Sequence, residues 1–160
     1  RQESTATIDL LEEFIDSGFN KDLAVKIINS VLVLKSYEDS FSTLDICTID
    51  MYTGKAEFTK IGASSTFLLR KNEVQILKSN SLPMGILKDV DIETFVKKLK
   101  EDDIIVMITD GLLELDDNSI EKERWIKDRL EEIDTKNPNE IANSILNEAK
   151  KLRKMLSRMI

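Results

Sequence analysis

The sequence predicts a single α+β domain, in which two helices precede six short strands and further helices follow. Apolar residues recur at helical spacing near both ends of the chain, whereas between residues 43 and 108 they alternate or cluster in short runs. Tight-turn residues separate most of these runs, which favours antiparallel pairing over βαβ units. A chain of 160 residues is long enough to bury a sizeable core.

Residues 1–35 predict a leading helix pair. Ser4 or Thr5 is expected to cap the first helix, which runs to about residue 17. Gly18 follows, at the position where helices commonly end with a glycine in the left-handed conformation. Asn20 caps the second helix, and so short a joint favours an antiparallel pair. The second helix is apolar on most of its surface, so it requires cover. Complete burial in one subunit and a partner surface both remain open.

Residues 41–114 form the predicted sheet region. Its strands are expected at residues 43–50, 56–61, 66–70, 73–77, 91–99 and 103–108. The last strand carries five consecutive apolar residues, which indicates burial on both faces. It ends in Thr109-Asp110-Gly111. Asp110 is therefore either a turn residue or a carboxylate held at a sheet edge, where it would suit a hard divalent cation.

Residues 119–154 predict the C-terminal helices. The first contains Trp125 and Ile126, and the second begins at Asn137, with Pro138 at its first position and Glu140 at its third. Residues 155–160 either extend this helix or form a final strand.

Composition narrows the possible functions. A formal net charge of −7 disfavours nucleic-acid binding, and no apolar run reaches the roughly 18 residues of a membrane span. The single cysteine, Cys47, fits a reducing, intracellular compartment and is expected in the core rather than as a nucleophile. Because the chain has no histidine, acid–base or metal chemistry must use carboxylates.

Several fragments occur in an order that is typical of one enzyme family. They are Phe41-Ser42-Thr43-Leu44-Asp45, Gly62-Ala63-Ser64, Leu82-Pro83-Met84-Gly85-Ile86, Leu99-Lys100-Glu101-Asp102-Asp103 and the segment from Ile108 to Glu114. In this order they resemble the PPM/PP2C-type metal-dependent serine/threonine phosphatases, and most closely the SpoIIE-type domain. The resemblance runs from Arg1 to about Leu152 and includes the Ile-Asn-Ser of the second helix.

This resemblance implies an α-β-β-α sandwich of two mainly antiparallel sheets flanked by helices, with a pair of Mn²⁺ or Mg²⁺ ions at one edge. Two such ions lower the pKa of a bridging water and neutralise the phosphoryl oxygens. The resemblance makes Asp110 a metal ligand, with Gly111 shaping its turn, and gives Glu114 a supporting or capping role.

Two of the family's motifs are missing from this chain. An Asp-Gly-Met-Gly motif is expected just before Arg1, and an Asp-Asp-(Met/Asn)-Thr motif is expected after the C-terminal helix, together with the family's first and last strands. With Asp110 as its one metal-binding aspartate, the chain alone is expected to lack a complete two-metal site and to be inactive.

The resemblance also implies a substrate and partners. The substrate would be a phosphoserine on an anti-sigma-factor antagonist, whose dephosphorylation activates a sporulation sigma factor. The leading helices would act as a switch and form a homodimer, and full-length relatives are membrane-anchored with this domain on the cytoplasmic side. The alternatives are a non-catalytic PPM-like module for dimerisation or partner binding, and an unrelated α/β sandwich with a chance Thr-Asp-Gly.

Overall fold

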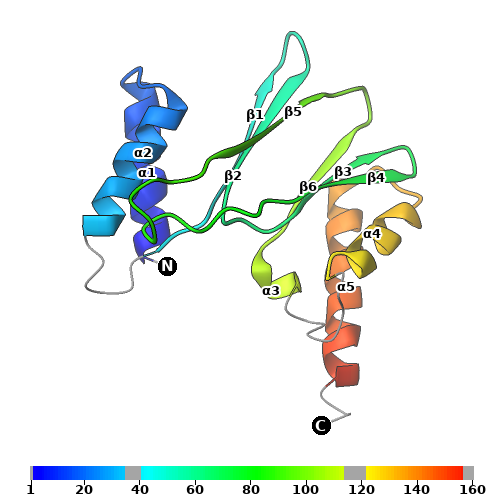
Figure 1. The fold of residues 1–160 in the computed structure, drawn as a ribbon. Coiled ribbons are helices and arrows are strands. Elements are labelled where there is room, and N and C mark those ends of the chain that lie inside the picture. The colour runs from blue at the N-terminus through cyan, green and yellow to red at the C-terminus, as the bar shows by residue number, and fades with distance from the viewer. Residues whose placement is uncertain (1, 35–40, 114–121, 157–160) are drawn as a thin grey trace. The chain divides into compact units, whose positions relative to one another are not determined.

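A computed structural model describes residues 2–34, 41–113 and 122–156 (Figure 1). The chain divides into two compact units, each built from separate segments. The first comprises Arg1–Ala63 and Ser79–Lys98, and the second comprises Ser64–Lys78 and Leu99–Ile160. The predicted sheet region is therefore shared between two units, each with its own sheet.

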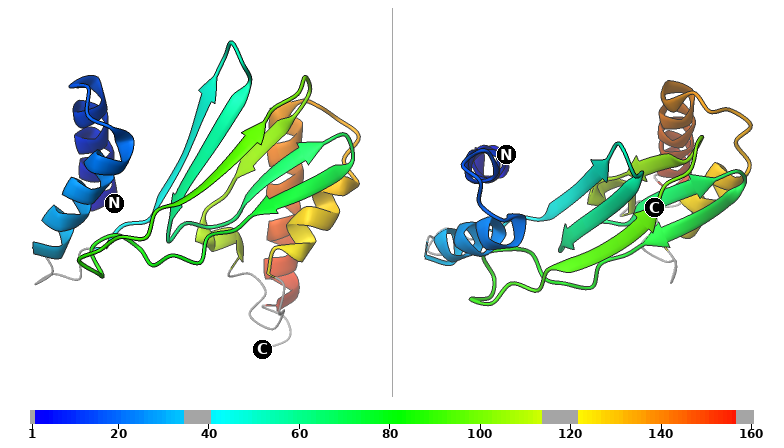
Figure 2. Two further views of the ribbon diagram at one scale, coloured as in Figure 1. Left: turned by 45° about the horizontal axis from the view of Figure 1, so that its top comes forward. Right: turned by 90° about the horizontal axis from the view of Figure 1, so that it is seen from above.

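The first unit combines two helices with a three-stranded antiparallel sheet of order β1-β2-β5. Its elements are α1 (Gln2–Asp16), α2 (Lys21–Leu34), β1 (Leu44–Asp50), β2 (Lys55–Ile61) and β5 (Glu93–Lys98). The two helices pack against each other and run in broadly opposite directions (Figures 1 and 2). The apolar core of this unit joins α2 to the adjacent ends of β1 and β2. Its buried members are Leu11, Ala24, Val25, Ile28, Leu32, Leu44, Ile61 and Met84.

The second unit has a three-stranded antiparallel sheet of order β4-β3-β6, and helix α4 packs on β3 and β4 (Figure 2). Its elements are β3 (Thr66–Arg70), β4 (Glu73–Leu77), β6 (Ile104–Met107), α3 (Asp110–Leu113), α4 (Arg124–Glu131) and α5 (Pro138–Leu156). Phe67 of β3 is fully buried, and it packs with the apolar faces of α4 and α5. The buried members of this core are Phe67, Ile126, Leu130, Ile141 and Ile145.

Most of the elements agree with the prediction of an α+β fold with antiparallel sheets. Gly18 has a φ of +84°, as expected after α1. The Asn20 side chain accepts a hydrogen bond from the Asp22 N–H at 2.9 Å, which confirms the cap of α2. Helix α5 ends at Leu156, so residues 155 and 156 extend the helix, whereas residues 157–160 lie outside the described residues. In the part of the chain that the structure describes, no helix is long and apolar enough to cross a membrane.

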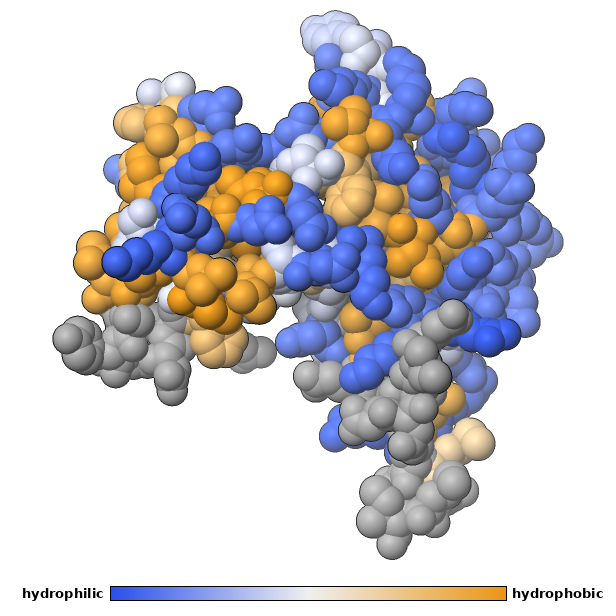
Figure 3. Space-filling model, in the orientation of Figure 1, coloured by the Kyte–Doolittle hydropathy of each residue, from blue (hydrophilic) through white to orange (hydrophobic). Residues whose placement is uncertain are grey.

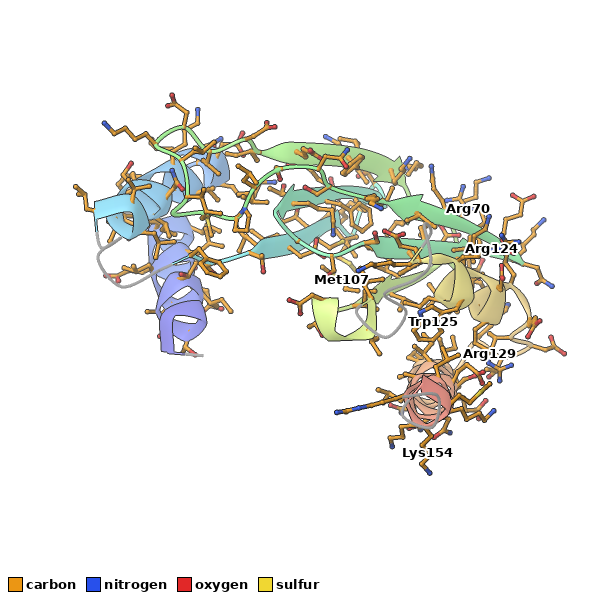
Figure 4. The ribbon with its side chains drawn as sticks, turned by 60° about the horizontal axis from the view of Figure 1, so that its bottom comes forward. Arg70, Met107, Arg124, Trp125, Arg129 and Lys154 are labelled. Carbon is orange, nitrogen blue, oxygen red and sulfur yellow. The ribbon has the colours of Figure 1, made fainter. Side chains whose placement is uncertain are left out.

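Two local predictions are wrong. Helix α1 already includes Gln2, so Ser4 and Thr5 lie within it and do not cap it; Gln and Glu are good helix formers, which extends the helix towards the N-terminus. Strand β6 is not buried on both faces: three of its residues are half-buried, and Met107, which Figure 4 labels, is 42% exposed. Among the described residues β6 lies at the edge of its sheet, next to β3 alone, so its apolar run is incompletely covered.

Candidate functional site

Asp110 lies where β6 gives way to the short helix α3 (Figure 1). Its side chain is exposed, and its Oδ1 accepts a hydrogen bond from the Gly111 N–H at 3.0 Å. The backbone around it is held by the Leu112 N–H, which donates to the Thr109 carbonyl at 3.1 Å. An exposed carboxylate next to a paired strand is an available oxygen ligand for Mg²⁺ or Mn²⁺.

Gly111 does not require the special conformational freedom of glycine in this structure. Its φ lies outside the left-handed region, and no atom lies within 4 Å of the position that a Cβ would occupy. The turn that follows Asp110 is therefore compatible with other residue types. Any specific need for glycine at residue 111 would have to come from a ligand.

The metal chemistry implied by the resemblance requires more than Asp110. Within residues 2–34, 41–113 and 122–156, no three Asp, Glu, Cys or His side chains are grouped so as to hold a metal ion. Asp110 fits as one hard ligand, but the described residues do not form a two-metal centre. Glu114 and the acidic pair Asp116 and Asp117 lie outside the described residues.

The other acidic residues of β1 have structural roles. Asp45 forms an ion pair with the fully buried Lys60, with Oδ2 2.6 Å from Nζ. Asp50 ends β1 and accepts hydrogen bonds from the N–H groups of Tyr52 and Thr53 at 2.9 and 3.0 Å. These bonds, led by that from Thr53, hold the pKa of Asp50 below its usual value. Asp45 thus lies on an edge strand of its sheet, and Asp50 lies at the turn that follows it.

Cys47 of β1 is a poor nucleophile. The residue is half-buried, and burial, reinforced by the charge of Asp45, raises the pKa of its thiol. The reactive thiolate is therefore disfavoured. This agrees with the expectation that Cys47 is not a nucleophile, but Cys47 is half-buried and belongs to neither apolar core, contrary to the expected core position.

Three of the sequence motifs meet at one place in the first unit. Ser42 and Met84 exchange backbone hydrogen bonds of 3.0 and 2.8 Å. The Gly62 N–H donates to the Ser81 hydroxyl at 3.0 Å, and Pro83 packs directly on Gly62. We call this group (residues 42, 62 and 81–85) the motif junction. It consists of backbone and small polar contacts and contains no acidic ligand.

Glu123 is a buried acid of the second unit that the sequence reasoning missed. Its carboxylate accepts a hydrogen bond from the Ser65 hydroxyl at 2.9 Å and lies 2.8 Å from the Lys78 Nζ. Burial alone would raise the pKa of Glu123, but the hydrogen bonds from Lys78 and Ser65 bring it below its usual value. The residue therefore ties the start of α4 to the start of β3 and the end of β4.

A hollow in the second unit is lined by charged residues from three turns. Two of its carboxylates are paired: Asp103 makes two hydrogen bonds with Arg70, at 2.9 and 2.6 Å, and Asp102 pairs with Lys136 (Figure 4 labels Arg70). On α4, Arg129 donates to Ser144 of α5 at 2.7 Å. These contacts hold turns and helices together.

Comparison with known proteins decides the family. The model of the family "Stage II sporulation protein E (SpoIIE)" matches residues 2–157. The chain belongs to the SpoIIE family. It is 33% identical over 151 residues to the stage II sporulation protein E of Bacillus subtilis, which covers 94% of this chain and 18% of that protein. The chain therefore spans less than a fifth of the length of this SpoIIE relative.

Solved SpoIIE structures share the fold. The PP2C phosphatase domain of B. subtilis SpoIIE, solved with a fragment of its regulatory domain, has a TM-score of 0.83 and 33% identity. This match covers 94% of the present chain and 45% of that one. A Mn-presoaked structure of the same phosphatase domain has a TM-score of 0.67 and 31% identity, with coverages of 92% and 66%. The α+β fold with two three-stranded sheets is thus that of a SpoIIE-type PPM phosphatase domain.

Proposed function

We propose that this chain is part of a Mn²⁺- or Mg²⁺-dependent protein serine phosphatase in which Asp110 is a metal ligand. The observation that carries the proposal is an exposed carboxylate at the end of β6, in a domain with the SpoIIE phosphatase fold. The relative that was presoaked with Mn supports the choice of metal. The metal pair would supply an activated water and charge neutralisation.

Within this proposal, the described residues hold Asp110 at a fixed strand end but do not complete the metal centre. We therefore expect the 160-residue chain by itself to show no turnover of a phosphoserine substrate with excess Mn²⁺. Robust hydrolysis by the isolated chain would contradict this expectation.

Replacing Asp110 tests the metal assignment in a complete phosphatase domain. Asp110→Asn should lower the rate of Mn²⁺-dependent hydrolysis by more than about 100-fold. Losing a residue that only hydrogen-bonds to a metal ligand typically lowers activity by about 10- to 100-fold, and losing the ligand itself should lower it further. Mn²⁺ titration calorimetry should show the same loss as weaker binding. The control is Asp134→Asn, because Asp134 is another exposed acid of the second unit. Equal Mn²⁺ affinity in both variants would refute the assignment.

We further propose that the substrate is a phosphoserine on an anti-sigma-factor antagonist, and that its dephosphorylation activates a sporulation sigma factor on the cytoplasmic side of the membrane. Family membership supports this proposal. The complete domain should release phosphate from such a phosphoprotein faster than from a denatured phosphoserine peptide. Equal rates would argue against a dedicated protein substrate.

The second candidate is a dimerisation or partner-binding module, which the surface of the leading helices favours. Figure 3 shows apolar side chains gathered over α1 and α2. The exposed ones are Ile8, Leu10, Ile15, Phe19, Leu23, Val31 and Leu34. Leu34 is 80% exposed and Leu23 is 48% exposed, so α2 is not completely covered within the described residues.

Sedimentation of surface variants tests this candidate. Ile15→Lys and Val31→Lys should weaken self-association, since each would place a charge in the proposed homodimer contact. The matched control is Ile49→Lys, because Ile49 is similarly exposed on β1 of the same unit. Unchanged self-association with intact circular dichroism would argue against an interface on these helices.

A further inference from the structure

Asn29 is a buried amide on the otherwise apolar inner face of α2. It is 1% exposed, and its neighbours on this face include the buried Val25, Ile28 and Leu32. An apolar residue at this position would complete the face by packing alone. A buried amide instead requires hydrogen-bond partners, and these partners indicate its role.

All three partners of the Asn29 side chain are backbone groups of one loop. Its Oδ1 accepts a hydrogen bond from the Gly85 N–H at 2.8 Å, and its Nδ2 donates to the carbonyls of Leu87 and Lys88 at 2.9 and 3.0 Å. One acceptor and two donors are thus used at once. Neither a carboxylate nor an aliphatic side chain of this size offers that combination.

The same loop is fixed on its other side to the motif junction. Met84 exchanges backbone hydrogen bonds with Ser42, just before β1, while Ser81 and Pro83 contact Gly62, just after β2. Gly85 therefore lies between two attachments, one to the sheet through Met84 and one to α2 through Asn29. Lys21 also joins α2 to β2 directly, because its ammonium donates to Glu57 at 2.5 Å and to the Thr59 hydroxyl at 2.6 Å.

We propose that Asn29 is a positioning residue that couples the placement of α2 to the conformation of residues 84–88. Moving α2 must either carry the loop with it or break three hydrogen bonds together. Coupling of this kind is reciprocal, so a change at the motif junction must also affect α2. A ligand or partner that displaces α2 would thereby change the backbone contacts at the start of β1 and the end of β2, because the loop makes those contacts.

Amide hydrogen exchange of the full chain tests the coupling. Asn29→Leu has a similar volume and suits the apolar face, but it removes all three hydrogen bonds. We expect the protection of the Gly85 amide, and also that of Ser42 and Met84, to fall by roughly tenfold or more. The central amides of β2 should keep their protection. Ser30→Ala is the matched control, because the Ser30 hydroxyl bonds only within α2, to the Lys26 carbonyl, among the contacts described.

A variant at the other end of the loop tests reciprocity and does not depend on the folding of Asn29→Leu. Ser81→Ala removes the acceptor of the Gly62 N–H. It should raise the exchange rates of the α2 amides around Asn29. At the Met84 amide, the fold increase in exchange rate in the double variant should be smaller than the product of the increases in the two single variants. A purely local role for Asn29 predicts faster exchange at Gly85 alone. That result, or unchanged α2 exchange in Ser81→Ala, would overturn the proposal.

Discussion

Replacing Gly62 by alanine is expected to destabilise the chain more than the same change at Gly18. Both glycines have positive φ, +58° at Gly62 and +84° at Gly18. A Cβ at Gly62 would lie 2.5 Å from the nitrogen and 2.7 Å from the Cα of Pro83, whereas one at Gly18 would have no atom within 4 Å. The pair therefore separates the cost of the backbone conformation from the cost of close contact.

The expected magnitudes follow from these two terms. A left-handed conformation costs an alanine about 1–2 kcal/mol. Alanine also lowers the conformational entropy of the unfolded chain, which stabilises the folded protein by about 0.4–1 kcal/mol and partly offsets that cost. Gly18→Ala should therefore lose about 1 kcal/mol of unfolding free energy. At Gly62 the clash is with the backbone and ring of Pro83, which cannot rotate away, and this adds about 1–3 kcal/mol. Gly62→Ala should lose about 2–4 kcal/mol in total.

Urea unfolding followed by circular dichroism measures these differences. Gly111→Ala serves as a third member of the series, because Gly111 is helical and has open space around its Cα. Its unfolding free energy should stay the same or rise by up to about 1 kcal/mol. If Gly62→Ala and Gly18→Ala lose the same free energy within about 0.5 kcal/mol, close approach to Pro83 is not what requires glycine at residue 62.

Two further predictions concern the second unit. Thermal unfolding should show that Phe67→Ala loses about 3–5 kcal/mol of unfolding free energy, because Phe67 is fully buried. The control Val96→Ala, at a 53% exposed position of the first unit, should change the unfolding free energy by less than about 0.5 kcal/mol. Equal losses in the two variants would contradict the assigned core. The hydrogen bonds from Arg70, followed by that from the Lys100 N–H, lower the pKa of Asp103 against the effect of burial. The contribution of Asp103 to the unfolding free energy should therefore be complete above about pH 4 and be lost as the pH falls through the lower folded-state pKa. Below about pH 4, the urea midpoint of Asp103→Asn should therefore fall less steeply with pH than that of the parent protein.

Part of the candidate site was predictable from the sequence. Asp110 stood out because a carboxylate directly follows an apolar strand, and the order of the surrounding motifs gave it a metal-binding interpretation that remains a prediction. Glu123 and Asn29 carried no such signal. A glutamate near the start of a helix and an asparagine in a helix are common, and only their partners, 58 residues away at Ser65 and 56 at Gly85, distinguish them.

The sequence by itself determined the local structure. The hairpin β3–β4, the left-handed Gly18 and the cap at Asn20 depend on residues close together in the chain, so periodicity and turn chemistry suffice to predict them. The tertiary structure alone decided the pairing of β5 with β2 and of β6 with β3. The edge position of β6, and with it the exposure of Met107, depends on which strands lie beside it. Pairing between distant segments is set by packing, which periodicity does not record.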